Sequence, residues 1–257
     1  MSTLLGNGPF QLLILFFAQV ASALLTIHHL SMRLFLAPVD HWCRPPLGYA
    51  LSLDTPGRKT VVSEWNLVCD RAWYVCIAFL YNRLGAILVV PFSGQISDRI
   101  GRQPVICTCI IVAVASAGAS VVAKTFLTFV VSCMLLAASL SIVKLLLIVV
   151  LFENSGEGYR DFYVCLANLG AIYGGIVVAA TDYYATERIM LNVIVFLLTM
   201  LLTSAYCFVD ESVSWLLVYR DYDRAENVIQ QASARNRQPH AGHYIFGSNS
   251  TGYRPTS

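Results

Sequence analysis

Long apolar stretches alternate with short polar connections along most of this chain, and that pattern is typical of a protein that crosses a membrane several times. A helix that spans the hydrocarbon core needs ~20 mostly apolar residues. The strict alternation of apolar and polar positions that membrane barrel strands require is absent from the sequence. We therefore predict an all-α membrane protein whose six transmembrane helices cover Phe10–Leu36, Ala72–Ser93, Val105–Ala123, Phe126–Phe152, Phe162–Ala180 and Ile189–Val209.

The composition agrees with a membrane protein. Of the 257 residues 57% are hydrophobic and only 12% are charged, whereas soluble domains carry about 25% charged residues. The net charge of +2 comes without a basic stripe, so the expected partner is the lipid bilayer and not nucleic acid. No lysine or arginine precedes the first apolar stretch, and that stretch is too long for a secretory signal. We expect it to be a retained first helix.

A nine-residue segment between the second and third stretches, Gly94–Arg102, concentrates charge between two glycines. Asp98 stands shortly before the next helix, where a carboxylate can cap free amide groups and meet the positive end of the helix dipole. Arg99 and Arg102 carry the positive charge typical of a cytoplasmic connection. A charged tight turn without further function is the alternative interpretation.

Three segments of the chain are similar to known transporters. Gly94–Arg102 resembles the signature loop between helices 2 and 3 of the major facilitator superfamily, with Gln103 where a basic residue is usual. Val62–Asp70 resembles the T-E-W-N-L-V-C-D segment of the organic cation, organic anion and carnitine transporters in that superfamily. Glu211–Leu217 is similar to their E-S-P-R-W-L-L segment. The resemblance implies that residues 1–209 form the amino-terminal six-helix half of this fold.

The resemblance also implies a set of charged residues that close the cytoplasmic side through ionic contacts with one another and with a second bundle. The expected latch residues are Asp98, Arg99 and Arg102, and their ionic partners are Glu153, Arg160 and Glu211. Val213 and Ser214 replace the usual proline and arginine, so a weakened network is expected. Residues 210–237 would begin the central cytoplasmic loop, and the polar residues 238–257 form a tail that we expect to be disordered.

Two basic residues inside the predicted spans are candidates for the substrate pathway. Arg83 lies about midway through its span, where a charge costs at least ~2.5–3.5 kcal/mol and usually faces a cavity or a partner. Lys144 is closer to a helix end, so its side chain could instead reach water by snorkelling. A buried polar contact is the alternative for Arg83. Because the six spans contain no Asp or Glu, their charge hints at an anionic substrate.

The cysteines do not form a disulfide scaffold, since six of the eight lie in or at the edge of apolar spans. Cys43 and Cys69 lie in the polar loop after the first span, and on an oxidising side they could form a disulfide. No histidine and cysteine spacing fits a metal site, and we expect neither a cofactor nor enzymatic chemistry. His28 and His29 are adjacent and are expected to point to different faces of a helix.

Together these features predict transport of small organic ions by alternating access, with this chain as the amino-terminal half. Two alternatives are a truncated half that binds or regulates a full-length relative without transporting, and a half-transporter that dimerises to obtain a second bundle. A membrane-embedded enzyme is the weakest alternative. Eight basic residues flank one side of the spans and six the other, so the orientation rests on the resemblance, which places both termini in the cytoplasm, with the plasma membrane as the expected location.

Overall fold

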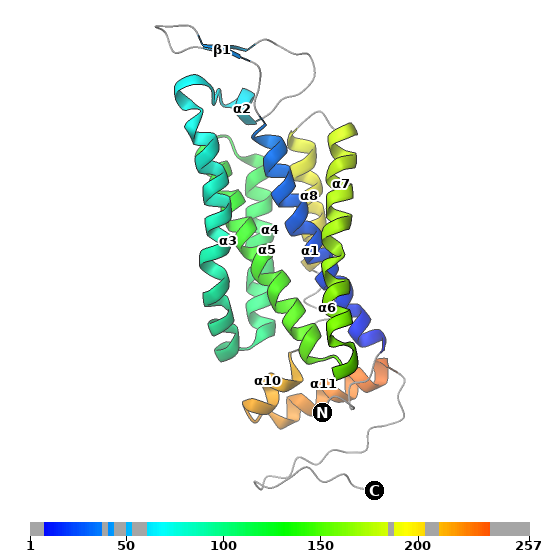
Figure 1. The fold of residues 1–257 in the computed structure, drawn as a ribbon. Helices are drawn as coiled ribbons and strands as arrows, with labels where there is room; N and C mark the ends of the chain where they lie inside the picture. Colours follow the sequence, from blue (N-terminus) through cyan, green and yellow to red (C-terminus); the bar gives the residue numbers. More distant parts are fainter. Residues whose placement is uncertain are drawn as a thin grey trace, which may run out of the picture.

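The computed structural model describes residues 8–37, 41–43, 50–52, 61–184, 188–203 and 211–236. Its long helices stand side by side as a bundle, with two short helices across one end and a pair of strands beyond the other (Figure 1). The bundle helices are α1 (Pro9–Phe35), α3 (Trp73–Ile100), α4 (Arg102–Val122), α5 (Phe126–Glu153), α6 (Arg160–Asn168), α7 (Gly170–Tyr184) and α8 (Arg188–Thr203).

Within the described residues, five helical segments are long and apolar enough to cross a membrane. They correspond to the first five predicted spans, although the fifth is divided at Leu169 into α6 and α7. The sixth prediction corresponds to α8, whose apolar part is shorter, Leu191–Thr203. The last residues predicted for that span lie outside the described part of the chain.

Helix α3 is longer than predicted and continues to Ile100, so that only Gly101 separates it from α4. Gly101 has φ of 112° and ψ of 157°, a conformation that is essentially restricted to glycine. The expectation that Asp98 lies in a loop and caps the next helix is therefore wrong. Asp98 belongs to the last turn of α3, and its backbone is already helical.

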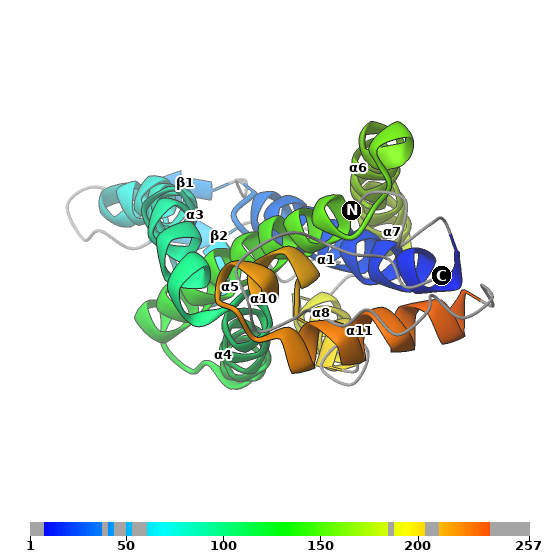
Figure 2. The same ribbon diagram turned by 90° about the horizontal axis from the view of Figure 1, so that it is seen from below.

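Helix α5 lies at the centre of the bundle, where it packs against α1, α3 and α4 (Figure 2). Its completely buried leucines, among them Leu140 and Leu147, belong to the main apolar core. On the other side of α1, Gly170 and Gly174 allow α7 to lie directly on the α1 backbone. A Cβ added to Gly174 would be 2.5 Å from the carbonyl oxygen of Ala23. Small residues at this face of α7 thus allow the two helix backbones to approach closely.

The segment between α1 and α3 contains structure that the sequence did not predict. Strands β1 (His41–Cys43) and β2 (Ala50–Ser52) pair antiparallel, and the short helices α2 (Val61–Glu64) and η1 (Cys69–Arg71) follow. The tryptophan of the transporter-like segment, Trp65, packs against Phe129 with ring centroids 5.5 Å apart. Its Nε1 donates to the carbonyl oxygen of Lys124 at 3.3 Å. Trp65 thus holds this segment against the turn between α4 and α5.

Candidate functional site

The end of the bundle opposite the strands carries a network of charged side chains centred on Arg102. The guanidinium of Arg102 lies 2.8 Å from Oε1 of Glu153 on α5 and 3.4 Å from Oδ1 of Asp98 on α3. The side chains of Arg102 and Glu153 are only 14% and 20% exposed, whereas that of Asp98 is 68% exposed. Because water screens exposed ion pairs, the Arg102–Glu153 pair is the stronger of the two.

Glu211 caps the first turn of α4. Its Oε1 accepts from the backbone N–H of Arg102 at 2.8 Å, and its Oε2 accepts from that of Gln103 at 3.2 Å. The carboxylate therefore satisfies two amide groups that have no partner within the helix, and its charge faces the positive end of the helix dipole. The capping role predicted for Asp98 belongs to Glu211, a residue more than a hundred positions away in the sequence.

Two short helices that follow Glu211 fasten to the same end of the bundle: α10 (Val213–Val218) and α11 (Tyr222–Arg235). The carbonyl oxygen of Asp98 accepts hydrogen bonds from Trp215 Nε1 at 2.9 Å and from the hydroxyl of Tyr219 at 3.0 Å. Ser212 donates from its hydroxyl to Oε2 of Glu153 at 2.6 Å. The turn between α3 and α4, the end of α5 and the start of α10 are thus joined in one polar network.

A second attachment joins the end of α11 to the start of α1. Asn236 accepts from the backbone N–H of Phe10 at 3.1 Å through Oδ1, and its Nδ2 donates to Oε1 of Gln11 at 3.2 Å. Gln11 in turn donates from Nε2 to the carbonyl oxygen of Asn154 at 3.1 Å. Sequence reasoning missed Gln11 and Asn236, because single amides carry no pattern that identifies contacts at such long range.

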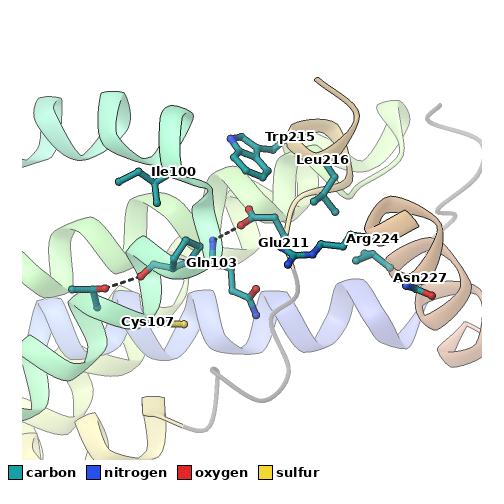
Figure 3. Close-up of a pocket in the computed structure, with 11 residues that line it drawn as sticks. Ile100, Gln103, Cys107, Glu211, Trp215, Leu216, Arg224 and Asn227 are labelled. Atoms are coloured by element: carbon teal, nitrogen blue, oxygen red, sulfur yellow. Dashed lines mark hydrogen bonds between the residues drawn. The ribbon is translucent and has the colours of Figure 1, made fainter. Parts of the chain in front are cut away.

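A cleft of about 690 Å³ lies between α4 and the pair α10–α11. Figure 3 shows Glu211 at this cleft between Gln103 and Trp215, with Arg224 and Asn227 on the side of α11. The carboxylate oxygens of Glu211 accept from backbone amides, and Nε of Arg224 lies 3.4 Å from Oδ2 of Asp221.

Two residues predicted for the charged network make different contacts. Arg160 donates from Nε to the carbonyl oxygen of Ser155 at 3.2 Å, and its guanidinium lies 5.0 Å from the centroid of the Phe152 ring. It forms no ion pair with a described residue, and Glu153 pairs instead with Arg102 and accepts from Ser212. Arg99 is exposed and makes no polar contact within the described part of the chain. The expected ionic pairing of these two arginines is therefore not observed.

The two basic residues predicted inside the membrane lie on α3 and α5, which pack against each other. Arg83 on α3 is exposed and Lys144 on α5 is partly buried, and neither forms an ion pair among the described residues. The charges of both act on the ring of His29 on α1, as does that of Arg33.

One of the two cysteines of the predicted disulfide is described in its bonded state. Cys69 is disulfide-bonded, and the side chain of Cys43 lies outside the described part, so the pairing of these two residues stays a prediction. Among the described residues, no group of three or more His, Cys, Asp or Glu side chains could hold a metal ion.

Comparisons with known proteins identify relatives of this chain. A family model described as "Sugar (and other) transporter" matches residues 54–244. The organic cation transporter protein of Drosophila melanogaster is 28% identical over 179 residues, which are 70% of this chain and 33% of that protein. The human organic cation/carnitine transporter 2 is 27% identical over 182 residues, 69% of this chain and 32% of the relative. This chain thus spans about a third of the length of these relatives.

Solved structures give the same fold. A double-tryptophan mutant of XylE superposes with a TM-score of 0.67 at 14% identity, covering 88% of this chain and 50% of that one. The inward-open xylose transporter XylE of E. coli superposes with a TM-score of 0.64 at 12% identity, covering 93% of this chain and 57% of that one. The bundle therefore has the fold of about half of such a structure.

Proposed function

This chain belongs to the sugar (and other) transporter family of the major facilitator superfamily, and we propose that it acts as the amino-terminal half of a transporter for small organic ions. Its relatives are transporters and not enzymes. The protein is a multi-pass membrane protein. In the proposed mechanism the described bundle forms one wall of a central pathway, and a second six-helix unit forms the other.

One observation carries this proposal: nearly the whole chain superposes on about half of a XylE structure. Alternating access requires two bodies that move against each other, and a six-helix bundle supplies one of them. A second bundle, from further sequence or from another chain, supplies the other. The small organic ion as substrate is supported by the names of the relatives, which include an organic cation transporter and an organic cation/carnitine transporter.

We assign the Arg102 network the role of a cytoplasmic gate. Arg102, Glu153 and Glu211 fix the end of α4 to α5 and to the α10 segment. The carboxylate of Asp98 is 68% exposed at the same place, so it is free to meet a helix end of the second bundle. The start of α1 and the end of α11 both lie at this end of the bundle, where the backbone N–H of Phe10 donates a hydrogen bond to Oδ1 of Asn236 at 3.1 Å. This supports our proposal that both termini lie in the cytoplasm, with the protein in the plasma membrane.

We assign Arg83 and Lys144 to the substrate pathway. A cation in the membrane interior normally faces a cavity, water or a partner, and neither residue has an acidic partner in the described part. Their positive charge, together with the lack of Asp and Glu in the predicted spans, favours anions among the possible organic ions.

The test is uptake by a complete two-bundle protein. The chain would be joined to the carboxyl-terminal half of human organic cation/carnitine transporter 2 and reconstituted in proteoliposomes. We expect saturable uptake of organic ions by the chimera, and none by the 257-residue chain or by the added half alone. The Asp98→Ala chimera should lose most of this uptake at an equal amount of inserted protein, whereas Asp223→Ala on the exposed face of α11 should not.

A chimera that is monodisperse and inserted, yet takes up no organic anion, cation or zwitterion, would contradict the proposal. Saturable uptake by the 257-residue chain alone that also requires Asp98 would instead identify a dimerising half-transporter. Crosslinking in the membrane would then detect the dimer.

A further inference from the structure

The last turn of α3 is capped by two aromatic side chains of α10. The final carbonyl groups of a helix have no hydrogen-bond partner within that helix. The carbonyl oxygen of Ser97 accepts from the amide of Gly101 at 3.0 Å, so Asp98 carries the first carbonyl group that the turn leaves over. This oxygen has two lone pairs, and it accepts from Nε1 of Trp215 at 2.9 Å and from the hydroxyl of Tyr219 at 3.0 Å. Trp215 and Tyr219 thus replace the helical hydrogen bond that α3 lacks at this position.

The first turn of α4 is capped by Glu211, which lies two residues before α10. The amides of Arg102 and Gln103 begin this helix, and Pro104, the next residue, has no amide hydrogen. Both amides donate to the carboxylate of Glu211, at 2.8 Å and 3.2 Å. A single short stretch of the chain, residues 211–219, therefore caps the end of one helix and the start of the next.

The two aromatic caps are joined to each other. Trp215 and Tyr219 are about one helical turn apart, and their rings stack with centroids 4.4 Å apart. The buried apolar side chains of α10, Val213 and Leu216, pack in a small cluster with α11 that is separate from the main core. Hydrogen bonds thus fasten α10 to the turn between α3 and α4, whereas apolar side chains fasten it to α11.

We propose that α10 is a strap that sets the position of the gate residue Asp98, with Trp215 and Tyr219 as positioning residues. The two aromatic side chains hold the carbonyl group of Asp98. Its carboxylate lies 3.4 Å from the guanidinium of Arg102, whose own amide is held by Glu211. Undocking of α10 frees the carbonyl group and the amides together, so the strap and the turn change as one two-state element. This inference rests on the proposed gate role of Asp98, and it adds the element that controls the gate.

Hydrogen exchange of single amides tests this coupling in the full 257-residue chain in lipid nanodiscs. Trp215→Phe and Tyr219→Phe keep aromatic rings and remove the two donors. The amides of Arg102 and Gln103 have a different partner, Glu211, so their exchange reports on the turn and not on the substituted side chains. One neutral hydrogen bond changes an equilibrium by about twofold to tenfold. We therefore expect the double variant to raise the exchange rates of these two amides by about tenfold.

The coupling must also act in the opposite direction, because linkage between two sites is reciprocal. Gly101→Ala changes the turn but no side chain of α10. It should raise the exchange rate of the Tyr219 amide, which donates to the carbonyl oxygen of Trp215 at 3.1 Å. Val218→Ala is the matched control, since this side chain of α10 is 77% exposed and makes none of these hydrogen bonds. It should leave the amides of the turn at the parent rate.

A transport measurement separates positioning of the gate from binding of the substrate. In the two-bundle chimera, the double variant Trp215→Phe/Tyr219→Phe should lower the maximal uptake rate about twofold to tenfold. The KM should stay at the parent value, because neither residue belongs to the proposed pathway of Arg83 and Lys144. Adding the double variant to Asp98→Ala should slow uptake no further than Asp98→Ala alone, since the aromatic pair acts through Asp98.

Several results would overturn the inference. They are parent-like exchange of the Arg102 and Gln103 amides in the double variant, an unchanged Tyr219 amide in Gly101→Ala, and a raised KM at a parent-like maximal rate. Exchange at the centre of α5 is the internal control for global unfolding. If it also rises, the two single variants, which each leave one donor on the carbonyl oxygen, decide the question in the same measurement.

The outcomes also separate this inference from the proposed function. If the chimera transports organic ions but the exchange of α10 and of the turn is uncoupled, the strap fails alone. If the exchange is coupled but the chimera takes up nothing, the strap stands and the proposed transport fails alone.

Discussion

The carboxylate of Glu211 lies against the backbone of Gly101, so that a Cβ added to Gly101 would be 2.6 Å from Oε2 of Glu211. The contact places the start of α10 directly beneath the turn between α3 and α4. Two requirements therefore meet at Gly101, namely a positive φ of 112° and room for the carboxylate. Glycine is the residue that satisfies both.

We expect Gly101→Ala to destabilise the protein. The backbone conformation alone costs about 1–3 kcal/mol for a residue with a Cβ, and the displaced carboxylate of Glu211 would also lose its amide partners. Thermal unfolding in detergent should show a lower midpoint. Gly94→Ala is the matched control, because a Cβ there meets no atom within 4 Å. Equal midpoints for the two variants would contradict the assigned contact.

Substitution of the capping residue Glu211 should lower the free energy of unfolding less than Gly101→Ala does. Glu211→Ala removes the acceptor for the amides of Arg102 and Gln103, and loss of an amino-terminal cap costs about 0.5–2 kcal/mol. Glu211→Gln keeps an acceptor but loses the charge that faces the helix dipole. Its free energy of unfolding should therefore lie between those of the parent protein and Glu211→Ala. The free energy of unfolding by denaturant checks the order. A loss as large for the exposed Asp223→Asn would show that general surface charge is responsible.

The ion pairs of Arg102 should differ in strength. In a double-mutant cycle, the partly buried pair with Glu153 should show a coupling energy within the range of about 0.5–3 kcal/mol for residues in contact. The pair with Asp98, which is far more exposed, should show about 0.2–1 kcal/mol. Unfolding of the single and double alanine variants gives both values. A larger coupling energy for Arg102–Asp98 than for Arg102–Glu153 would contradict the assignment of the shorter, less exposed pair as the stronger one.

A methyl group at the crossing of α7 and α1 should disturb the bundle. At Gly174 a Cβ would be 2.5 Å from the carbonyl oxygen of Ala23, a backbone atom that cannot move aside alone. We therefore expect Gly174→Ala to lower the thermal midpoint and the yield of monodisperse protein. Gly175→Ala, one residue further along α7, places its Cβ in open space and should behave like the parent. Indistinguishable variants would show that the helices do not pack this closely.

A disulfide between Cys43 and Cys69 remains a prediction, because only the bonded state of Cys69 is described. Peptide mapping of unreduced protein by mass spectrometry should recover the two cysteines in one linked pair of peptides. Cys76, whose thiol is free and exposed, should be alkylated in the same sample. Recovery of Cys43 as a free thiol, or linkage of Cys69 to a different cysteine, would contradict the pairing.

The apolar spans and the close helix packing could be predicted from the sequence because both depend on neighbouring residues. About twenty consecutive apolar residues are enough to specify a spanning helix, and five of the predicted spans are described as such helices. Gly170 and Gly174 are one helical turn apart, so their common face follows from the helix period alone. The transporter-like segments around Trp65 and Glu211 likewise identified the family from a few residues in fixed order.

The tertiary structure decided which polar groups meet. Asp98 and Glu211 are both acidic residues beside the start of α4, one near in sequence and one 109 positions from Arg102, and composition does not indicate which of them caps the helix. The same holds for Asn236 at the start of α1, 226 residues from Phe10, and for Asn82, which is hydrogen-bonded to both His28 and His29. The local sequence also did not indicate whether α3 ends before or after Asp98, because the single residue Gly101 is enough to form the turn to α4. Hydrogen bonds between distant residues depend on how the helices pack, and a linear pattern contains no record of that packing.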